Sequence, residues 1–181
     1  IKKIARNATA LVQSIMGNGW TNTLFPPTGP EKQVLDEIST EIPIALWSED
    51  HHSLWVNSKA LEVGGITQET PNPNGGYIER DERGEATGTL REGAANFVTE
   101  AIPDYTVEQY KEAILAYQSM ANSLGFTGVL DPMLFEGSNV IKAYKELSEN
   151  EELSMYFRGA YAFQPGMELS EIANFRYSQP N

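Results

Sequence analysis

The chain has 181 residues, 40% of them hydrophobic, and its 25 acidic and 13 basic side chains give a formal charge of −12. This length suits one domain or two small ones. The acidic balance argues against binding to nucleic acid, whose phosphates require Lys and Arg. The absence of cysteine excludes disulfides, thiolate chemistry and zinc fingers, and leaves imidazole and carboxylate as the side chains able to bind a metal.

The first fifty residues predict a helix, a long turn-rich segment and a strand. Apolar side chains recur at the helical period over residues 4–15, and Gly17 and Gly19 end this helix. In the turn-rich segment that follows, only residues 31–38 favour a short helix. Residues 43–50, PIALWSED, predict a buried strand because they are short, mostly apolar and bounded by proline and acids.

The next fifty residues predict a helix, a hairpin and another helix. In chain order we expect a helix over 51–66 that ends at Gly64 and Gly65, strands Tyr77–Arg80 and Ala86–Arg91 around a turn at Asp81–Gly84, and a helix from about residue 93 to near Pro103.

The second half of the chain shows the alternation of helices and strands that is typical of consecutive βα units. Thr106 and Gln109 form a capping box at the start of a helix, which Gly125 ends. After it we expect, in order, a strand at 125–131, a helix at 138–149, a strand at 153–163 and a short helix at 168–176. Short loops between such elements imply parallel crossovers, as in a (β/α) barrel or a doubly wound sheet.

The two halves therefore differ in class, with a seam near Pro103. We expect an α/β protein, or α+β if the mixed, β-rich first half dominates.

Asp50, His51 and His52 bring together one carboxylate and the only two imidazoles of the chain. Adjacent residues at a helix start point about 100° apart, and zinc ligands on a helix prefer an i, i+4 spacing, so the spacing is poor for a metal. The pattern favours an N-cap by Asp50 or Ser53 with a packed histidine. A catalytic role is the second interpretation.

Two further acids are candidates for chemistry. Glu92 follows a predicted strand, where it can face a cleft as a general base or metal ligand, or lie in the first turn of a helix. Asp131 closes the strand GFTGVLD. The carboxyl ends of strands hold active sites in α/β sheets and barrels, although capping of the next segment explains this residue equally well. Trp55 is expected in the core or lining a cleft.

Several segments in a fixed order carry a resemblance to a known family. They are GNGW (17–20), LD (35–36), PIALWSEDHHSLWVNSKALEVGGI (43–66), TPNPNGGYIERDERGEATGTLREGA (70–94), IP (102–103) and GFTGVLD (125–131). Together they resemble amidohydrolase family 3, the YtcJ-like metal-dependent hydrolases of the amidohydrolase superfamily.

For the fold, the resemblance implies part of a TIM (β/α) barrel with a large insertion. Residues 1–19 are then a helix of the barrel portion, residues 20–102 the β-rich insertion, and residues 103–181 consecutive βα units of the incomplete barrel.

For function, the resemblance implies hydrolysis of a non-peptide C–N bond in a small-molecule substrate by metal-activated water. The metal is divalent, commonly zinc. The family's HxH motif lies before this segment and its other ligands after it. We therefore expect no metal ligand and no cofactor within this chain, and no activity from the chain alone.

Position by position, the resemblance assigns catalytic roles to His52, Glu92 and Asp131. The family more often has Gly in place of His51, so His52 is the matching histidine. Asn57 and Trp55 are expected to bind substrate.

The chain opens with IKKIARNA, without Met, and closes with FRYSQPN, so we expect a piece of a longer polypeptide. We also expect a cytoplasmic protein without a membrane segment, and unpaired barrel edges allow a homo-oligomer. The alternative function is a stand-alone, non-catalytic module that binds a small molecule. A hydrolase that uses His52 with Asp50 as general base ranks last, since it lacks a nucleophile.

Overall fold

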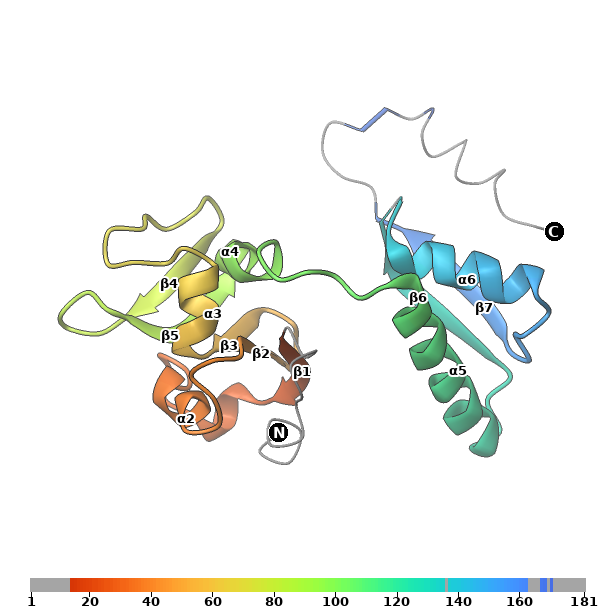
Figure 1. Cartoon of the computed structure of the whole chain (residues 1–181), viewed down its shortest axis with the longest axis horizontal. Helices are drawn as coiled ribbons and strands as arrows, with labels where there is room; N and C mark the ends of the chain where they lie inside the picture. Colours follow the sequence, from red (N-terminus) through yellow and green to blue (C-terminus); the bar gives the residue numbers. More distant parts are fainter. Residues whose placement is uncertain (1–13, 136, 163–166, 169, 171–181) are drawn as a thin grey trace. The chain divides into compact units, whose positions relative to one another are not determined.

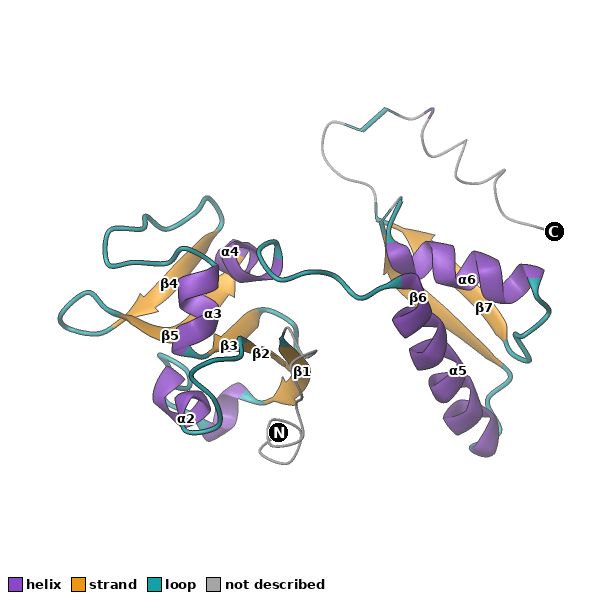
Figure 2. Cartoon of the chain, viewed as in Figure 1, coloured by secondary structure: helices purple, strands orange, loops and turns teal. Residues whose placement is uncertain are grey.

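The structure of the chain, a computed structural model, describes residues 14–135, 137–162, 167, 168 and 170. Figure 1 shows two units, and the chain divides between Pro103 and Asp104. Within the described residues each unit has a sheet of its own, with five strands in the first and two in the second (Figure 2).

The first unit is built on a sheet with the strand order β1-β2-β3-β5-β4. β1 runs parallel to β2, whereas the other neighbours are antiparallel. The strands are β1 (Ile15–Trp20), β2 (Ile44–Ser48), β3 (Ser53–Val56), β4 (Gly76–Arg80) and β5 (Ala86–Glu92). The helices are η1 (Asn22–Leu24), α2 (Lys32–Asp36), α3 (Ser58–Val63), η2 (Gly93–Ala95) and α4 (Asn96–Thr99).

The central strands of this sheet are buried on both faces. Leu54 and Val56 of β3 belong to one apolar core, which also holds residues of α3 and α4. Trp55, between them, belongs to a second core with Leu35 of α2. Successive side chains of a strand point to opposite faces, so the two cores lie on opposite sides of the sheet.

Local signals predicted several elements correctly. The strand expected at 43–50 is β2, the short helix at 31–38 is α2, and the hairpin is β4 and β5. Its turn is held by the Asp81 carboxylate, which accepts from the backbone N–H groups of Arg83 and Glu85 at 2.9 Å each.

The helix expected over 51–66 is wrong in its first half. Residues 53–56 form β3, all four of them buried, and the helix begins only at Ser58. A short apolar run such as residues 54–56 fits a fully buried strand as well as a helix, and pairing with β2 and β5 decides it.

The N-terminal expectation is also corrected where the structure describes it. Residues 15–20 form β1 instead of a helix end and loop, with Ile15 opposite Ile44 of β2. The rest of the helix expected at 4–15 lies outside the described residues. So does nearly all of the helix expected at 168–176.

The second unit contains α5 (Val107–Ser123), β6 (Gly128–Leu134), α6 (Asn139–Glu149) and β7 (Tyr156–Tyr161). The capping box is confirmed, since the Thr106 hydroxyl accepts from the Gln109 N–H and the Gln109 side chain accepts from the Thr106 N–H. β6 and β7 are parallel neighbours joined through α6. The α/β expectation is therefore confirmed, while the strands within the described ranges form no closed barrel. Among those same residues, no helix is both long and apolar enough to cross a membrane.

Candidate functional site

His52 and Glu92 lie at the same end of neighbouring strands in the first unit. β3 and β5 are antiparallel with Ser53 opposite Arg91, so the residue before β3 meets the last residue of β5. The Glu92 N–H donates to the His52 carbonyl at 2.9 Å. The register thus brings together two candidate residues that are 40 positions apart in the sequence.

The two side chains form an imidazole–carboxylate pair. His52 Nδ1 lies 2.9 and 3.1 Å from the two carboxylate oxygens of Glu92. An ionised carboxylate only accepts hydrogen bonds, so Nδ1 donates. Among the described residues nothing hydrogen-bonds Nε2, and the side chains of His52 and Glu92 are 66% and 54% exposed. Nε2 is therefore free to exchange a proton with a ligand.

Asp50 fixes the backbone turn that presents His52. Its carboxylate accepts from the Ser48 hydroxyl at 2.6 Å and from the His52 N–H at 3.1 Å. These hydrogen bonds, first that of Ser48 and then that of His52, lower the pKa of Asp50. No helix starts here, so Asp50 caps a turn between β2 and β3 instead of the expected helix N-terminus.

The Glu92 backbone is strained. Its φ of 50° and ψ of −127° match the first central position of a type II′ turn, a position dominated by Gly. Such conformations cost a non-glycine residue roughly 1–3 kcal/mol and persist only where the surroundings enforce them. Glu92 is the last residue of β5, as the first of its two expected placements has it. It directly precedes η2, whose first turn contains no acidic residue, and its side chain makes no capping hydrogen bond there.

The pair favours the charged imidazole. The hydrogen bond to Glu92 and then the negative charge of Glu92 raise the pKa of His52, and the charge of Asp50 adds to them. An opposite charge in contact stabilises the protonated form. The site is therefore suited to hold a proton on His52 and release it.

Replacing Glu92 by Gln is expected to lower the pKa of His52 toward the ordinary histidine value of 6.5. The amide keeps an acceptor for Nδ1–H but removes the negative charge. Titration of the imidazole signals by NMR measures this change. Glu49→Gln, an exposed carboxylate in the same turn, is the control and leaves the pKa of His52 nearly unchanged. An unaltered pKa in Glu92→Gln contradicts the pairing.

The same shift has a consequence for stability. The folded pKa of His52 is raised, so the stabilisation by the pair is fully present below the unfolded pKa. It is lost as the pH rises through the folded pKa. The free energies of unfolding in urea of the unchanged chain and of Glu92→Gln are therefore expected to differ most below the unfolded pKa of His52 and to converge as the pH rises through its folded pKa.

Asn57 is placed by the structure in the core instead of a substrate cleft. It is fully buried. Its side-chain oxygen accepts from the N–H groups of Ile44 and Ala60 at 3.0 and 2.9 Å. Its amide nitrogen donates to the carbonyls of Ser39 and Ile42 at 2.8 and 2.9 Å. This hydrogen-bonding capacity is used within the unit, so Asn57 is a structural residue that caps α3.

Trp55 is likewise a core residue. It is only 8% exposed, and its indole N–H donates to the Glu31 carbonyl at 2.9 Å. Its ring packs against Trp20 and Phe25, with centroid distances of 6.5 and 5.5 Å. A large aromatic with its N–H satisfied in this way stabilises the core, which is one of the two placements expected for Trp55 from the sequence.

Asp131 belongs to the second unit, where it has a partner of its own. Its carboxylate accepts from the Tyr144 hydroxyl at 3.2 Å. Burial first, and the charge of Asp131 second, raise the pKa of Tyr144. The candidate residues that the structure brings together are therefore His52 and Glu92.

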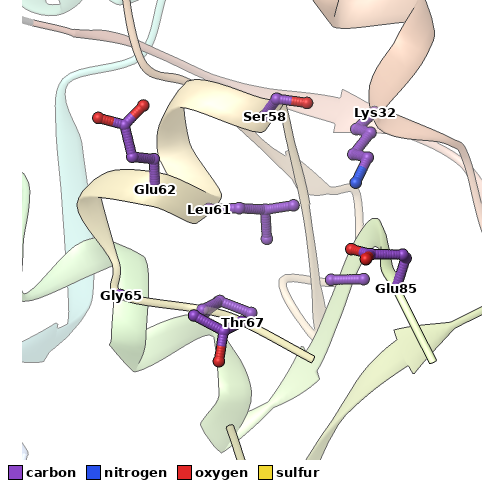
Figure 3. A pocket seen from close by; sticks show the side chains of 9 residues that line it. Lys32, Ser58, Leu61, Glu62, Gly65, Thr67 and Glu85 are labelled. Atoms are coloured by element: carbon purple, nitrogen blue, oxygen red, sulfur yellow. The ribbon is translucent and has the colours of Figure 1, made fainter. Parts of the chain in front are cut away.

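A cavity of about 320 Å³ opens elsewhere in the first unit. Figure 3 shows Leu61 between Glu62 on one side and Lys32 and Glu85 on the other. The complete lining is Lys32, Ser58, Leu61, Glu62, Gly65, Ile66, Thr67, Glu85 and Ala86. None of the candidate catalytic or substrate-binding residues predicted from the sequence lines this cavity.

Two residues that support the site escaped the sequence reasoning. Arg91 precedes Glu92 and is bound on every nitrogen of its guanidinium. Gly76 lies opposite Glu92 in the β4–β5 pair. Its neighbour Gly75 adopts a positive φ of 73°, whereas Gly76 is needed for space.

The fold and the pair define an α/β protein with an exposed imidazole–carboxylate pair at a sheet end. Comparison with known proteins gives the family. The sequence profile of the amidohydrolase family matches residues 1–176, and the chain belongs to this family. The resemblance seen in the sequence is thereby confirmed.

Two curated proteins show the extent of the similarity. Exoenzymes regulatory protein AepA of Pectobacterium carotovorum subsp. carotovorum is 32% identical over 136 residues, which are 74% of this chain and 29% of AepA. N-substituted formamide deformylase of Arthrobacter pascens is 39% identical over 109 residues, which are 58% of this chain and 20% of the deformylase. The chain thus spans less than a third of either protein.

A solved structure shares the fold. The crystal structure of an uncharacterized metal-dependent hydrolase from Pyrococcus horikoshii OT3 matches with a TM-score of 0.58 at 22% identity. The match covers 88% of this chain and 29% of that hydrolase.

Proposed function

We propose that this chain is a segment of a metal-dependent amidohydrolase that cleaves a C–N bond other than a peptide bond, and that the segment is inactive alone. The observation that carries the proposal is the His52–Glu92 pair in a member of the amidohydrolase family. The name of the deformylase relative, which states an action on N-substituted formamides, supports the bond type. The parallel β6–α6–β7 crossover supports a partial TIM barrel.

The metal, zinc in this proposal, supplies activated water and polarises the carbonyl when bound. The described residues do not fit it, because no three His, Asp or Glu side chains among them are grouped to hold a metal ion. We therefore place the metal ligands outside this part of the protein. The chain is proposed to contact the substrate and to supply a proton-transferring residue.

His52 is proposed to move the proton that C–N cleavage requires. When water adds to the carbonyl carbon and the C–N bond breaks, the departing nitrogen takes a proton. Nε2–H of the His52 imidazolium donates it, and the proton released by the water restores the imidazolium. Glu92 holds Nδ1–H and favours the charged ring through its own charge.

The test compares the complete protein encoded by the reading frame with the 181-residue chain. We expect the complete protein to contain zinc and to hydrolyse an N-substituted formamide until a chelator removes the metal. The chain alone is expected to hold no stoichiometric zinc after dialysis and to show no turnover. One tightly held zinc that is lost in His52→Ala or Glu92→Ala contradicts the proposal, as does turnover that resists chelation.

The cavity favours a second candidate, a non-catalytic module that binds a small molecule. Its volume of about 320 Å³ lies at the lower end of the range for ligand pockets. This candidate requires that the complete protein bind small amides without hydrolysing them and that Leu61→Trp, which fills the cavity, abolish the binding. Turnover in the first experiment decides against it.

A further inference from the structure

The strained conformation of Glu92 needs neighbours that enforce it, and Gly76 is one of them. A Cβ atom at Gly76 would lie 2.5 Å from the Ala94 nitrogen and 2.7 Å from the Gly93 nitrogen and the Arg91 carbonyl oxygen. Such distances are far below van der Waals contact with backbone atoms, which cannot turn aside as a side chain can. Glycine is thus required here so that β4 can pack against the chain on both sides of Glu92.

Arg91 fixes the chain just before Glu92. Its Nε lies 3.1 Å from a carboxylate oxygen of Glu79, and the two side chains are only 13% and 11% exposed. Its other two nitrogens donate to the Ser53 hydroxyl at 2.8 Å, the Asn22 side-chain oxygen at 3.1 Å and the Pro27 carbonyl at 2.9 Å. A planar guanidinium with this many partners holds one orientation.

We propose that Gly76 and Arg91 are positioning residues that hold Glu92 in its strained conformation and so keep its carboxylate on Nδ1 of His52. Arg91 holds the end of β5 just before Glu92 through its hydrogen bonds. Gly76 allows β4 to pack closely against Gly93 and Ala94, just after Glu92. Glu92 can relax only if one of these contacts gives way. This inference deepens the proposed function, since it rests on the role given there to the pair.

The test reads the contact itself through the pKa of His52, measured by NMR titration of the 181-residue chain. Two histidines are present, so His51→Asn serves as the background and leaves one imidazole. Asn tolerates the positive φ of 58° at this position. The charged groups acting on His52 are Glu92 and Asp50, and Glu92→Gln in this background defines the pKa without the pair.

In this background, Gly76→Ala is expected to move the pKa of His52 most of the way to the Glu92→Gln value. The matched control is Gly64→Ala. There the new Cβ lies 2.9 Å from the Phe97 carbonyl oxygen, at an ordinary φ of −74°. Gly64→Ala also disturbs packing in the first unit and is expected to leave the pKa of His52 unchanged.

A folded Gly76→Ala variant with an unchanged pKa overturns the inference, and so does an equal shift in Gly64→Ala. If Gly76→Ala does not fold, Arg91→Lys decides, because it keeps the positive charge but loses the forked hydrogen bonds. The pKa of His52 is again expected to fall, and an unchanged value refutes the role of Arg91. The titration needs no turnover. The positioning role can therefore be refuted while the proposed hydrolase activity stands, and the hydrolase activity can be refuted while the positioning role stands.

Discussion

His52→Gln is expected to lower kcat of the proposed hydrolase by about 10²–10⁴-fold, the range that a positioned proton donor contributes. Gln has a similar reach and can hydrogen-bond Glu92, but it cannot carry the proton that Nε2 of His52 is proposed to deliver. The side chain is exposed and contacts Glu92, so the fold is expected to tolerate the change. Steady-state kinetics on an N-substituted formamide measure the effect.

The neighbouring imidazole provides the control. His51 lies beside the Trp47 ring, at a centroid distance of 6.0 Å, and His51→Asn is expected to change kcat by only a few-fold. A loss in His51→Asn as large as that in His52→Gln refutes the assignment to Nε2, as does an unchanged kcat in His52→Gln.

The pH profile adds a signature that a structural role does not produce. A donor must be protonated, so kcat falls as the pH rises through the pKa of His52. Glu92 raises that pKa, so Glu92→Gln is expected to move this descending limb to lower pH. A limb that stays in place assigns the titration to another group.

The sequence identified the two residues of the pair but not their contact. His52 and Glu92 were candidates because of their residue types and the family resemblance. Their meeting depends on the register of β3 against β5, and residues 53–56 were assigned to a helix. A short apolar run such as residues 54–56 has no period of its own that separates the two structures, so only pairing across the sheet could identify it.

Asn57 and Trp55, which the resemblance predicts to bind substrate, are buried in the structure. Both lie in the segment SLWVN that carries the family pattern, and the resemblance could not distinguish residues shared for packing from residues shared for substrate. The structure separates them by burial, since Asn57 is fully buried and Trp55 nearly so, while His52 is exposed. Buried polar residues of this kind are satisfied by hydrogen bonds within the fold.

Elements defined by local chemistry were easier to predict than those defined by distant partners. The capping box at Thr106 and the hairpin turn at Asp81 depend on residues a few positions apart. By contrast, β1 forms because Ile15 pairs with Ile44 across a parallel ladder, and the space at Gly76 is set by residues of β5 and η2, at least 15 positions further along the chain. Neither leaves a signal in its own segment.

Asn57→Ala is expected to lower the free energy of unfolding of the first unit by about 4 kcal/mol. Loss of the N-cap costs roughly 1 kcal/mol, and leaving the buried Ile44 N–H and two carbonyls without their partner adds roughly 3 kcal/mol. Urea unfolding followed by tryptophan fluorescence reports on this unit, because all three tryptophans precede residue 103.

Asn72→Ala is the matched control, since the Asn72 side chain makes one such bond, from the Ile78 N–H at 2.9 Å, and its loss is expected to cost only about 1 kcal/mol. The comparison separates two accounts of Asn57. If Asn57 bound substrate at the surface of a cleft, its truncation would leave stability nearly unchanged and would raise KM. An asparagine in the buried network with Ile44, Ala60 and Ser39 lowers stability when it is truncated. The reason is that β2, the strand that leads to the turn at Asp50, then loses its hydrogen-bonded attachment to α3. Equal unfolding midpoints for Asn57→Ala and Asn72→Ala contradict the structural role.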